Sequence, residues 1–132
     1  MPMHSWIVAA LAIPLMAGTA LAQEADSGHA LYDQYCSTCH QRTGVGIQRG
    51  SGMQPYYPPL AGNFFLMGNE TQLATLLLRG RAGMPTWAAL TDDQIAKIAT
   101  YARSAWGNKA SPITPDTIAK TRKTLAPTPL GD

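Results

Sequence analysis

The stretch "CSTCH", residues Cys36–His40, contains the two cysteines of this 132-residue chain, and a histidine directly follows the second cysteine. Two thiols and an imidazole this close together have three interpretations: a redox disulfide of the Cys-x-x-Cys type, a zinc site, or covalent attachment of a c-type haem. The disulfide interpretation requires a βαβ pattern around the motif. Zinc requires four ligands, and His29 is the remaining candidate for the fourth. The rest of the sequence therefore has to decide among them.

The first 22 residues have the features of a secretory signal peptide. An apolar run extends from about Trp6 to Ala17, and Ala20-Leu21-Ala22 fits the small-x-small pattern of a cleavage site. We expect cleavage between Ala22 and Gln23 and a mature protein in the periplasm. The absence of Lys and Arg before the apolar run departs from the usual pattern, and an uncleaved membrane anchor is the alternative. In an oxidising compartment two free thiols do not persist, so something must occupy them.

Residues 23–107 form the predicted domain, and residues 108–132 form a proline-containing basic tail. Between Gln23 and Trp106 six Lys/Arg residues balance six Asp/Glu residues, whereas the tail has four basic and two acidic residues. A balanced domain lacks the clustered basic face that nucleic-acid binding requires, so we expect no nucleic-acid partner. Within the tail, Thr114 and Pro115 can begin a short helix that ends near Thr124. Such a helix would dock on a partner subunit, lie on its own domain, or fray.

Capping residues and apolar periodicity predict an all-α domain with three main helices. The first begins at Asp26 or Ser27 and runs to about Tyr35. The second follows Asn69 and ends at Gly80, and the third follows a capping box of Thr91 and Gln94 and ends before Gly107. One further turn of helix is expected at Phe64–Met67. We find no segment that alternates convincingly with a period of two, so no strand is predicted.

The segments between these helices are long and rich in glycine and proline. They nevertheless carry apolar and aromatic side chains, namely Met53, Tyr56, Tyr57, Leu60, Phe64 and Phe65. Long loops in a small domain are usually functional, and solvent does not tolerate so many exposed apolar groups well. A domain of this size also has a marginal core without a cofactor or crosslink. The loops are therefore expected to form the walls of a large apolar site.

Covalent haem attachment meets all of these requirements. In a c-type signature the two sulfurs, here Cys36 and Cys39, bond to the porphyrin vinyl groups and the histidine, His40, binds the iron. Haem iron in an electron carrier takes a second ligand, and Met84 lies in a Gly-Met-Pro turn 44 residues after His40. The proline fixes the backbone beside the methionine, and the glycine permits close approach to the porphyrin. Met53 and Met67 are the alternatives, and packing explains them better.

From about Gly28 to Asn108 the chain resembles the bacterial class I cytochromes c. The resemblance rests on "GHALYDQYCSTCHQRTGVG", "YYPPLAGN" and "MPTWAALTDDQIAKIATYARSAWGN", in that order. It implies the cytochrome c fold, with helices and long loops wrapped around one covalently bound haem c that His40 and Met84 ligate. It also implies that the first and last helices of the domain cross. That crossing would pair Gly28 and Tyr32 with Tyr101 and Ala102.

The resemblance further implies which residues line the haem pocket. In the family a proline carbonyl accepts the ring N–H of the histidine ligand. Pro59 matches that proline, with Pro58 as the alternative. A haem propionate would be held by Arg49, Arg81, Trp87 or a loop tyrosine.

The predicted ligand set implies electron transfer without bond chemistry. With His40 and Met84 on the iron, no position remains for a substrate, so we expect a periplasmic single-electron carrier that is not an enzyme. Its partners would be periplasmic redox proteins that dock on a local patch near the haem edge. The alternative is the haem c subunit of a larger catalytic protein, of the dehydrogenase or nitrite reductase type. A gas sensor or peroxidase would require Met84 to leave the iron.

Overall fold

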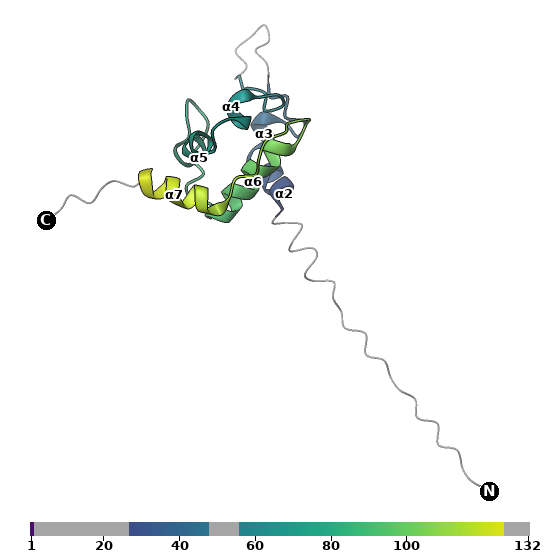
Figure 1. Cartoon of the computed structure of the whole chain (residues 1–132). Helices are drawn as coiled ribbons and strands as arrows, with labels where there is room; N and C mark the ends of the chain where they lie inside the picture. The colour runs from purple at the N-terminus through teal and green to yellow at the C-terminus, as the bar shows by residue number, and fades with distance from the viewer. Residues whose placement is uncertain (2–26, 48–55, 126–132) are drawn as a thin grey trace, which may run out of the picture.

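Two helices that are far apart in the sequence, α2 (Gly28–Tyr35) and α6 (Asp92–Ser104), cross at one side of the fold (Figure 1). The computed structural model describes Met1 and residues 27–47 and 56–125. Apart from Met1, the predicted signal peptide with its cleavage site lies outside the described residues, as do Arg49 and Met53. Ser27 caps α2 by accepting a hydrogen bond from the amide of Ala30, and the predicted capping box begins α6.

The crossing of α2 and α6 is close because Gly28 has no side chain. A Cβ atom at this position would collide with the carbonyl oxygen of Lys97 and lie 3.0 Å from the Cβ of Tyr101. Tyr32, one turn further along α2, is completely buried, and its ring centroid lies 5.3 Å from that of Tyr101. The prediction that these two helices cross is confirmed.

The second long helix, α5 (Glu70–Arg79), runs on the other side of the molecule. Asn69 caps it, as predicted, by accepting a hydrogen bond from the amide of Gln72 at 2.9 Å. Two helices of a single turn complete this part of the fold, α3 (Ser37–His40) and α4 (Phe64–Met67). The described residues contain two isolated β-bridges and no strand, so the all-α prediction is confirmed. Among these residues no helix is both long enough and apolar enough to cross a membrane.

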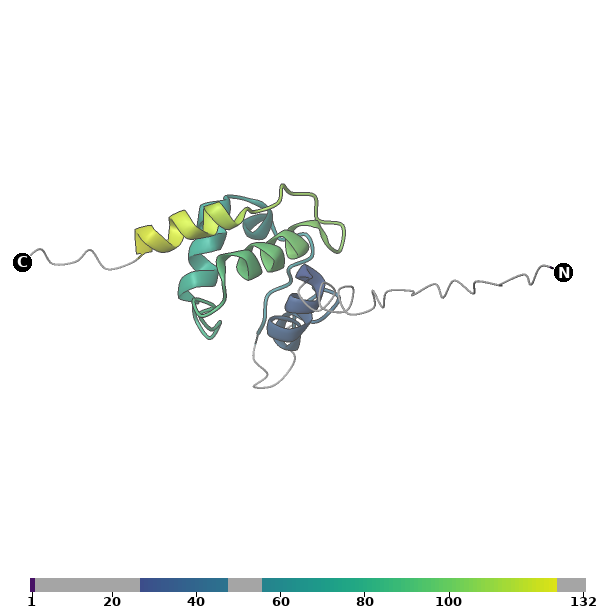
Figure 2. The same cartoon turned by 90° about the horizontal axis from the view of Figure 1, so that it is seen from below.

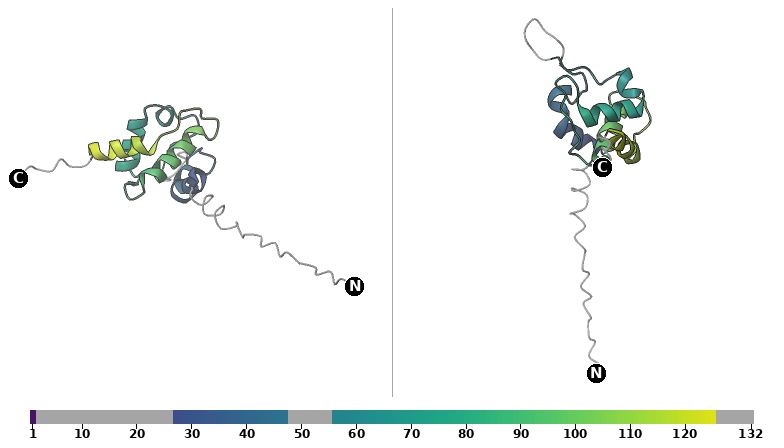
Figure 3. Two further views of the ribbon diagram at one scale, coloured as in Figure 1. Left: turned by 60° about the horizontal axis from the view of Figure 1, so that its bottom comes forward. Right: turned by 90° about the vertical axis from the view of Figure 1, so that its left-hand side faces the viewer.

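The segment after residue 107, predicted as a tail with a possible short helix, packs against the rest of the domain as far as residue 125. Helix α7 (Pro115–Leu125) packs on α5 and α6, and α6 lies between α2 and α7 (Figures 2 and 3). Ile113 and Ile118 are buried in the same apolar cluster as the inner faces of α5 and α6. Among the described residues the longer helices are α2, α5, α6 and α7. The helix expected from Thr114 or Pro115 to about Thr124 is present, and of the arrangements considered it adopts the one in which it lies on its own domain.

Two buried polar residues attach this C-terminal segment to the domain. The Asn108 side-chain amide donates to the carbonyls of Leu60 and Ala102, while its oxygen accepts from the amide of Gly62. Arg103, only 2% exposed, donates at 2.7 Å to the carbonyls of Leu66 and Ser111, and also to that of Gly68. Because buried donors and acceptors need partners, these bonds fix the path from α6 to α7.

Candidate haem site

The two cysteines and the histidine of the motif lie on one helical turn. The amides of Cys39 and His40 both donate to the carbonyl of Cys36, at 3.2 and 2.9 Å. Cys36 is buried and Cys39 is half-buried, and both thiols are free. Burial, followed by the charge of the neighbouring Cys39, raises the pKa of Cys36 to about 12. Before any modification the Cys36 sulfur is therefore uncharged at neutral pH, as its apolar surroundings require.

The ring of His40 is oriented by a backbone carbonyl. Its Nδ1 lies 3.0 Å from the carbonyl oxygen of Pro58, and because a carbonyl only accepts, Nδ1 carries the proton. The lone pair on Nε2 is then available to a metal. The prediction that Pro59 supplies this carbonyl is wrong. The Pro59 carbonyl instead accepts from the side-chain amide of Asn63, which also caps α4 and so draws that carbonyl toward α4.

A glycine allows the Pro58 segment to approach the histidine. Gly46 has a φ of +66°, and a Cβ atom on it would collide with the carbonyl of Tyr57 and lie 2.8 Å from the Pro58 carbonyl oxygen. Its amide donates to the carbonyl of His40 at 3.1 Å. The next residue, Ile47, exchanges two backbone hydrogen bonds with Tyr57, at 2.9 and 3.0 Å. The chain thus holds the histidine's acceptor in place through short backbone contacts.

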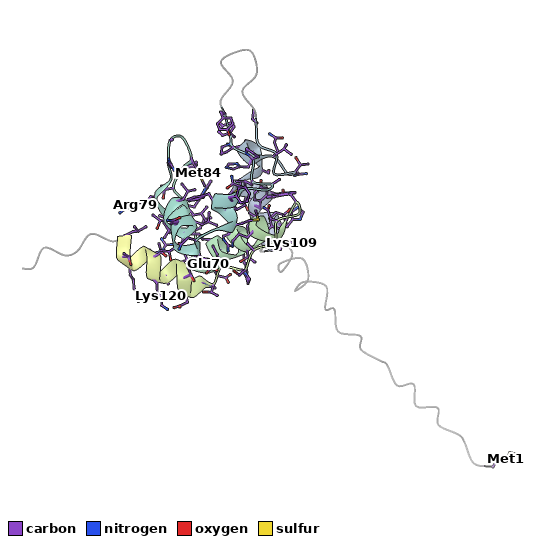
Figure 4. All side chains as sticks on the ribbon, turned by 45° about the horizontal axis from the view of Figure 1, so that its top comes forward. Met1, Glu70, Arg79, Met84, Lys109 and Lys120 are labelled. Carbon is purple, nitrogen blue, oxygen red and sulfur yellow. The ribbon has the colours of Figure 1, made fainter. Side chains whose placement is uncertain are left out.

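Met84 lies on the loop between α5 and α6, on the side that faces α3 (Figure 4). Its backbone exchanges two hydrogen bonds with Arg81, at 3.0 and 2.8 Å, which closes a tight turn. Gly80 ends α5 with φ 70° and ψ 175°, and a Cβ atom there would lie 2.5 Å from the carbonyl oxygen of Met84. That backbone region strongly favours glycine, and the lack of a side chain lets the Met84 carbonyl approach, so the end of α5 sets the start of the methionine turn.

The C-terminal end of α5 also holds the residues that follow Met84. The hydroxyl of Thr86 donates to the carbonyl of Leu78 at 2.6 Å, and the amide of Trp87 donates to the carbonyl of Leu77 at 2.9 Å. The last carbonyls of a helix have no partners within the helix, and here the loop supplies them. The bonds that satisfy the end of α5 therefore also fix the chain directly after Met84.

His40 and Met84 face the same space from opposite parts of the chain. A cavity of about 460 Å³ and an adjoining one of about 270 Å³ are both lined by Cys36, His40 and Met84. The larger cavity is otherwise mainly apolar, with walls from the loops and the inner faces of α5 and α6, including Leu60, Phe65, Leu66, Leu73, Leu77 and Ile98. Its volume lies in the range of protein sites that enclose cofactors.

The apolar loop residues that the sequence assigned to these walls divide into two groups. Tyr56, Leu60 and Phe65 line the larger cavity, and Tyr57 lines the smaller one. Phe64 is 89% exposed, so the prediction that it forms a wall is wrong. The one-turn helix α4 turns Leu66 inward and leaves Phe64 on the outer surface.

Trp87 provides a buried donor without a partner. Its indole Nε1 is buried and makes no hydrogen bond within the described part of the chain, and the residue lines the smaller cavity beside Tyr35. An unpaired buried donor costs about 1–3 kcal/mol, so an acceptor from a bound group is expected there. The site therefore fits a haem with its carboxylate side chains. It offers two thiols, an imidazole with a free Nε2, a methionine sulfur, apolar walls and this indole donor.

The zinc interpretation lacks its fourth ligand. His29 lies on α2 with 62% of its side chain exposed, and its Nε2 is 3.8 Å from a carboxylate oxygen of Asp33. Within residues 27–47 and 56–125 no three His, Cys, Asp or Glu side chains lie close enough together to hold a metal ion.

Comparison with known proteins identifies the family. Residues 23–101 match the family described as cytochrome c oxidase, cbb3-type, subunit III. The match spans both the Cys36–His40 motif and Met84. This chain belongs to that family of c-type cytochromes. The cofactor of the family is covalently bound haem c, and its members transfer electrons rather than catalyse bond chemistry.

Individual relatives of this cytochrome differ in size. A cbb3-type cytochrome c oxidase subunit CcoP of Azospirillum brasilense is 35% identical over 67% of the chain, which spans 30% of that protein. The cytochrome c subunit of a quinone-dependent alcohol dehydrogenase of Gluconacetobacter polyoxogenes is 32% identical over 76% of the chain, which spans 23% of it. Cytochrome c-552 of Thermus thermophilus is 33% identical over 89% of the chain and is matched over 88% of its own length. The cytochrome thus spans less than a third of the oxidase and dehydrogenase relatives.

Sequence reasoning missed two positions that shape the site. The first, Gly46, belongs to the "TGVG" run directly after the motif, and two closely spaced glycines there are a signal for left-handed backbone. The second is the inner face of α5. Its apolar periodicity predicts a buried helix face, but it does not show that this face forms a wall of the cavity. No local signal distinguishes a leucine that packs on a helix from one that packs on a cofactor.

Proposed function

We propose that this cytochrome is a single-electron carrier in which Cys36 and Cys39 hold one haem through thioether bonds and His40 and Met84 are the axial ligands. The observation that carries the proposal is that both cavities share Cys36, His40 and Met84, although 44 positions separate the two ligands in the sequence. When bound, the haem supplies an iron that alternates between the ferric and ferrous states. The chain attaches this group, orients its ligands and excludes water from it.

Each residue of the site has a distinct task in this proposal. The Pro58 carbonyl accepts the proton-bearing Nδ1 of His40, which fixes the ring and increases its basicity toward a metal. The Met84 sulfur favours the ferrous state and raises the reduction potential. The unpaired Nε1 of Trp87 would donate to a haem propionate. With His40 and Met84 both bound to the iron, no coordination position would remain for a substrate.

The attachment of haem can be tested on the denatured protein. If thioether bonds form, haem absorbance stays with the polypeptide after denaturation and acid extraction. If the absorbance is extracted completely, the assignment of Cys36 and Cys39 is overturned. The ferric native protein should also show the methionine–iron absorption band.

The surface beside the larger cavity is suited to transient contact with a redox partner. Phe64 and Phe65 are 89% and 44% exposed, and Phe65 lines both the larger cavity and a groove along α5. Arg79 and Arg81 border the same groove. Redox encounters use small interfaces, and we propose that periplasmic redox proteins dock here. Phe64→Ser should slow electron transfer to a partner purified from the native periplasm and leave the reduction potential unchanged.

The second function is that of haem subunit in a larger periplasmic oxidoreductase. Relatives that are cytochrome subunits of alcohol and fructose dehydrogenases support it. Purification from the native source distinguishes the two: a catalytic chain that copurifies in fixed ratio indicates a subunit, and recovery of the cytochrome alone indicates a carrier.

The periplasmic location rests on the proposed cleavage after Ala22. The small-x-small pattern of Ala20-Leu21-Ala22 supports that site. N-terminal sequencing of the mature protein tests it, and a first residue other than Gln23 or its cyclised form would contradict it.

A further inference from the structure

Helix α7 carries an arginine, Arg122, that bonds to the methionine loop, which we define as residues 80–91. The helix lies beyond the family match, which ends at residue 101, and it packs along α5 and α6 (Figure 2). Its residue Arg122 reaches away from the helix to the chain that follows Met84. This contact joins segments more than 30 positions apart in the sequence.

Arg122 uses all three guanidinium nitrogens in this contact. Its Nη1 donates to the carbonyl of Ala88 at 2.7 Å, and its Nη2 donates to the carbonyl of Leu90 at 3.0 Å. Its Nε donates to a carboxylate oxygen of Asp92 at 2.9 Å. A planar guanidinium offers its donors in a fixed fork, so three simultaneous bonds define the position of the whole segment from residue 88 to 92.

The residues held by Arg122 form the last turn of the methionine loop. The amide of Leu90 donates to the carbonyl of Trp87 at 2.9 Å, so the turn is continuous with the residue that lines the smaller cavity. At its other side the loop is bonded to the carbonyls that end α5, as described above. The loop is therefore held at two places that both follow Met84 in the sequence. Residues 86 and 87 bond to the end of α5, and residues 88, 90 and 92 bond to Arg122 of α7.

A comparison with Lys120 separates this contact from an ordinary surface ion pair. Lys120 lies on the outer face of α7 (Figure 4), and it pairs with Asp116 of the same helix while both side chains are at least 70% exposed. Exposed pairs of that kind contribute little. Arg122 and Asp92 are 35% and 32% exposed, and Arg122 additionally donates to two carbonyls of another segment. Charge-assisted bonds of this geometry are stronger than neutral ones.

We propose that Arg122 is a positioning residue for Met84: by holding residues 88–92, α7 keeps the methionine loop closed over the haem. This inference rests on the proposed ligation by His40 and Met84. Without the Arg122 bonds, the loop opens more often and Met84 leaves the iron in a larger fraction of molecules. A ligand added in solution reports that fraction, because its apparent Kd falls in proportion as the open fraction rises.

The test is a titration of the ferric haem-loaded protein with imidazole, followed through the methionine–iron band. In Arg122→Ala the apparent Kd should fall by about tenfold relative to wild type. Arg122→Lys, which keeps the charge but not the fork, should give a smaller decrease. Lys120→Ala should match wild type. Ile118→Val, which trims a fully buried side chain of the same helix that makes no hydrogen bond, controls for a general loss of stability.

The proposal is overturned if imidazole affinity in Arg122→Ala stays within about twofold of Lys120→Ala. It is also overturned if Ile118→Val raises the affinity as much as Arg122→Ala does, since the effect would then follow overall stability. Should Arg122→Ala not fold, Arg122→Lys and Asp92→Asn provide the same comparison with smaller decreases in Kd. A wild-type protein without covalent haem or without the methionine–iron band would instead refute the proposed function, so the two failures are distinguishable.

Discussion

The two sides of the cavity are built in different ways. The attachment wall, Cys36–His40, is one helical turn whose backbone bonds join neighbours in sequence, and its most distant hydrogen-bond partner is the Pro58 carbonyl. The methionine loop depends on the end of α5 before it and on Arg122 of α7 after it. The hydrogen bonds of the attachment wall stay within 18 positions of the chain, whereas Arg122 holds the methionine loop from more than 30 positions away. The attachment wall should therefore determine whether haem is present, and the methionine loop should determine how the iron behaves.

The largest effect is expected at the attachment wall. In the double variant Cys36→Ala, Cys39→Ala no sulfur can form a thioether, so haem retained by the denatured polypeptide should fall to background. Without haem the large apolar cavity has nothing to fill it, and stability should fall with it. Haem absorbance after denaturing electrophoresis measures the result.

The matched variant on the other side of the cavity is Met84→Ala. It should retain full covalent haem, and equal loss of haem in both variants would contradict the division of tasks between the two sides.

Removing the methionine sulfur should change the iron without releasing the haem. In Met84→Ala the methionine–iron band should disappear, and the reduction potential should fall because the ligand that favours the ferrous state is gone. Spectroelectrochemical titration measures both. Met67→Ala, at the end of α4, is the control and should leave band and potential as in wild type. Persistence of the band in Met84→Ala would exclude Met84 as the ligand.

A glycine pair tests the backbone of the methionine loop. Gly80→Ala places a side chain in a backbone region that is essentially restricted to glycine and against the Met84 carbonyl, so it should lower the free energy of unfolding by about 1–3 kcal/mol. It should also raise imidazole affinity. Gly62 has a similar φ of +68°, but nothing lies within 4 Å of an added Cβ atom, so Gly62→Ala is the matched control. Urea unfolding and imidazole titration measure the two effects.

If Gly62→Ala costs as much stability as Gly80→Ala, then the left-handed backbone alone explains the loss. The contact between Gly80 and the Met84 turn would then have no role in the stability of the loop.

The same contrast explains which features the sequence made predictable. The helix starts at Ser27, Asn69 and Thr91 were predictable because capping depends on residues three positions apart. The grouping of Cys36, Cys39 and His40 on one wall follows from a single helical turn. These features need no knowledge of the rest of the fold.

Other features depend on contacts that no short window of sequence contains. Pro58 and Pro59 offer equivalent carbonyls, and the choice between them is made by the side chain of Asn63. Helix α7 has a clear start at Pro115, but whether it lies on this domain depends on the faces of α5 and α6. The role of Arg122 cannot be read from its neighbours at all, because its partners are 30 to 34 positions away.

The smallest effect is expected at Tyr32, which supports the attachment wall. Its hydroxyl donates to the carbonyl of Gln41, directly after His40, at 2.8 Å. Burial, followed by the nearby Cys36, Tyr101 and Asp33, raises the pKa of Tyr32 well above its ordinary value of 10.0. Above pH 10.0, and below the raised pKa, Tyr32 loses its phenolic proton in the unfolded chain and keeps it in the folded chain. The folded state then binds more protons, so the stability that Tyr32 contributes decreases as the pH rises past 10.0.

Tyr32→Phe should therefore have opposite consequences at neutral and alkaline pH. At neutral pH the variant loses the bond to Gln41 and about 1 kcal/mol of stability. Between about pH 9 and 11 its stability should fall less steeply than that of wild type, and urea unfolding across that range measures the slope. Equal slopes would show that Tyr32 is not the group that titrates. Because Tyr32 bonds to the attachment wall and not to the methionine loop, the imidazole affinity of Tyr32→Phe should equal that of wild type. A change there would mean that the two sides of the cavity are coupled through the α2–α6 crossing.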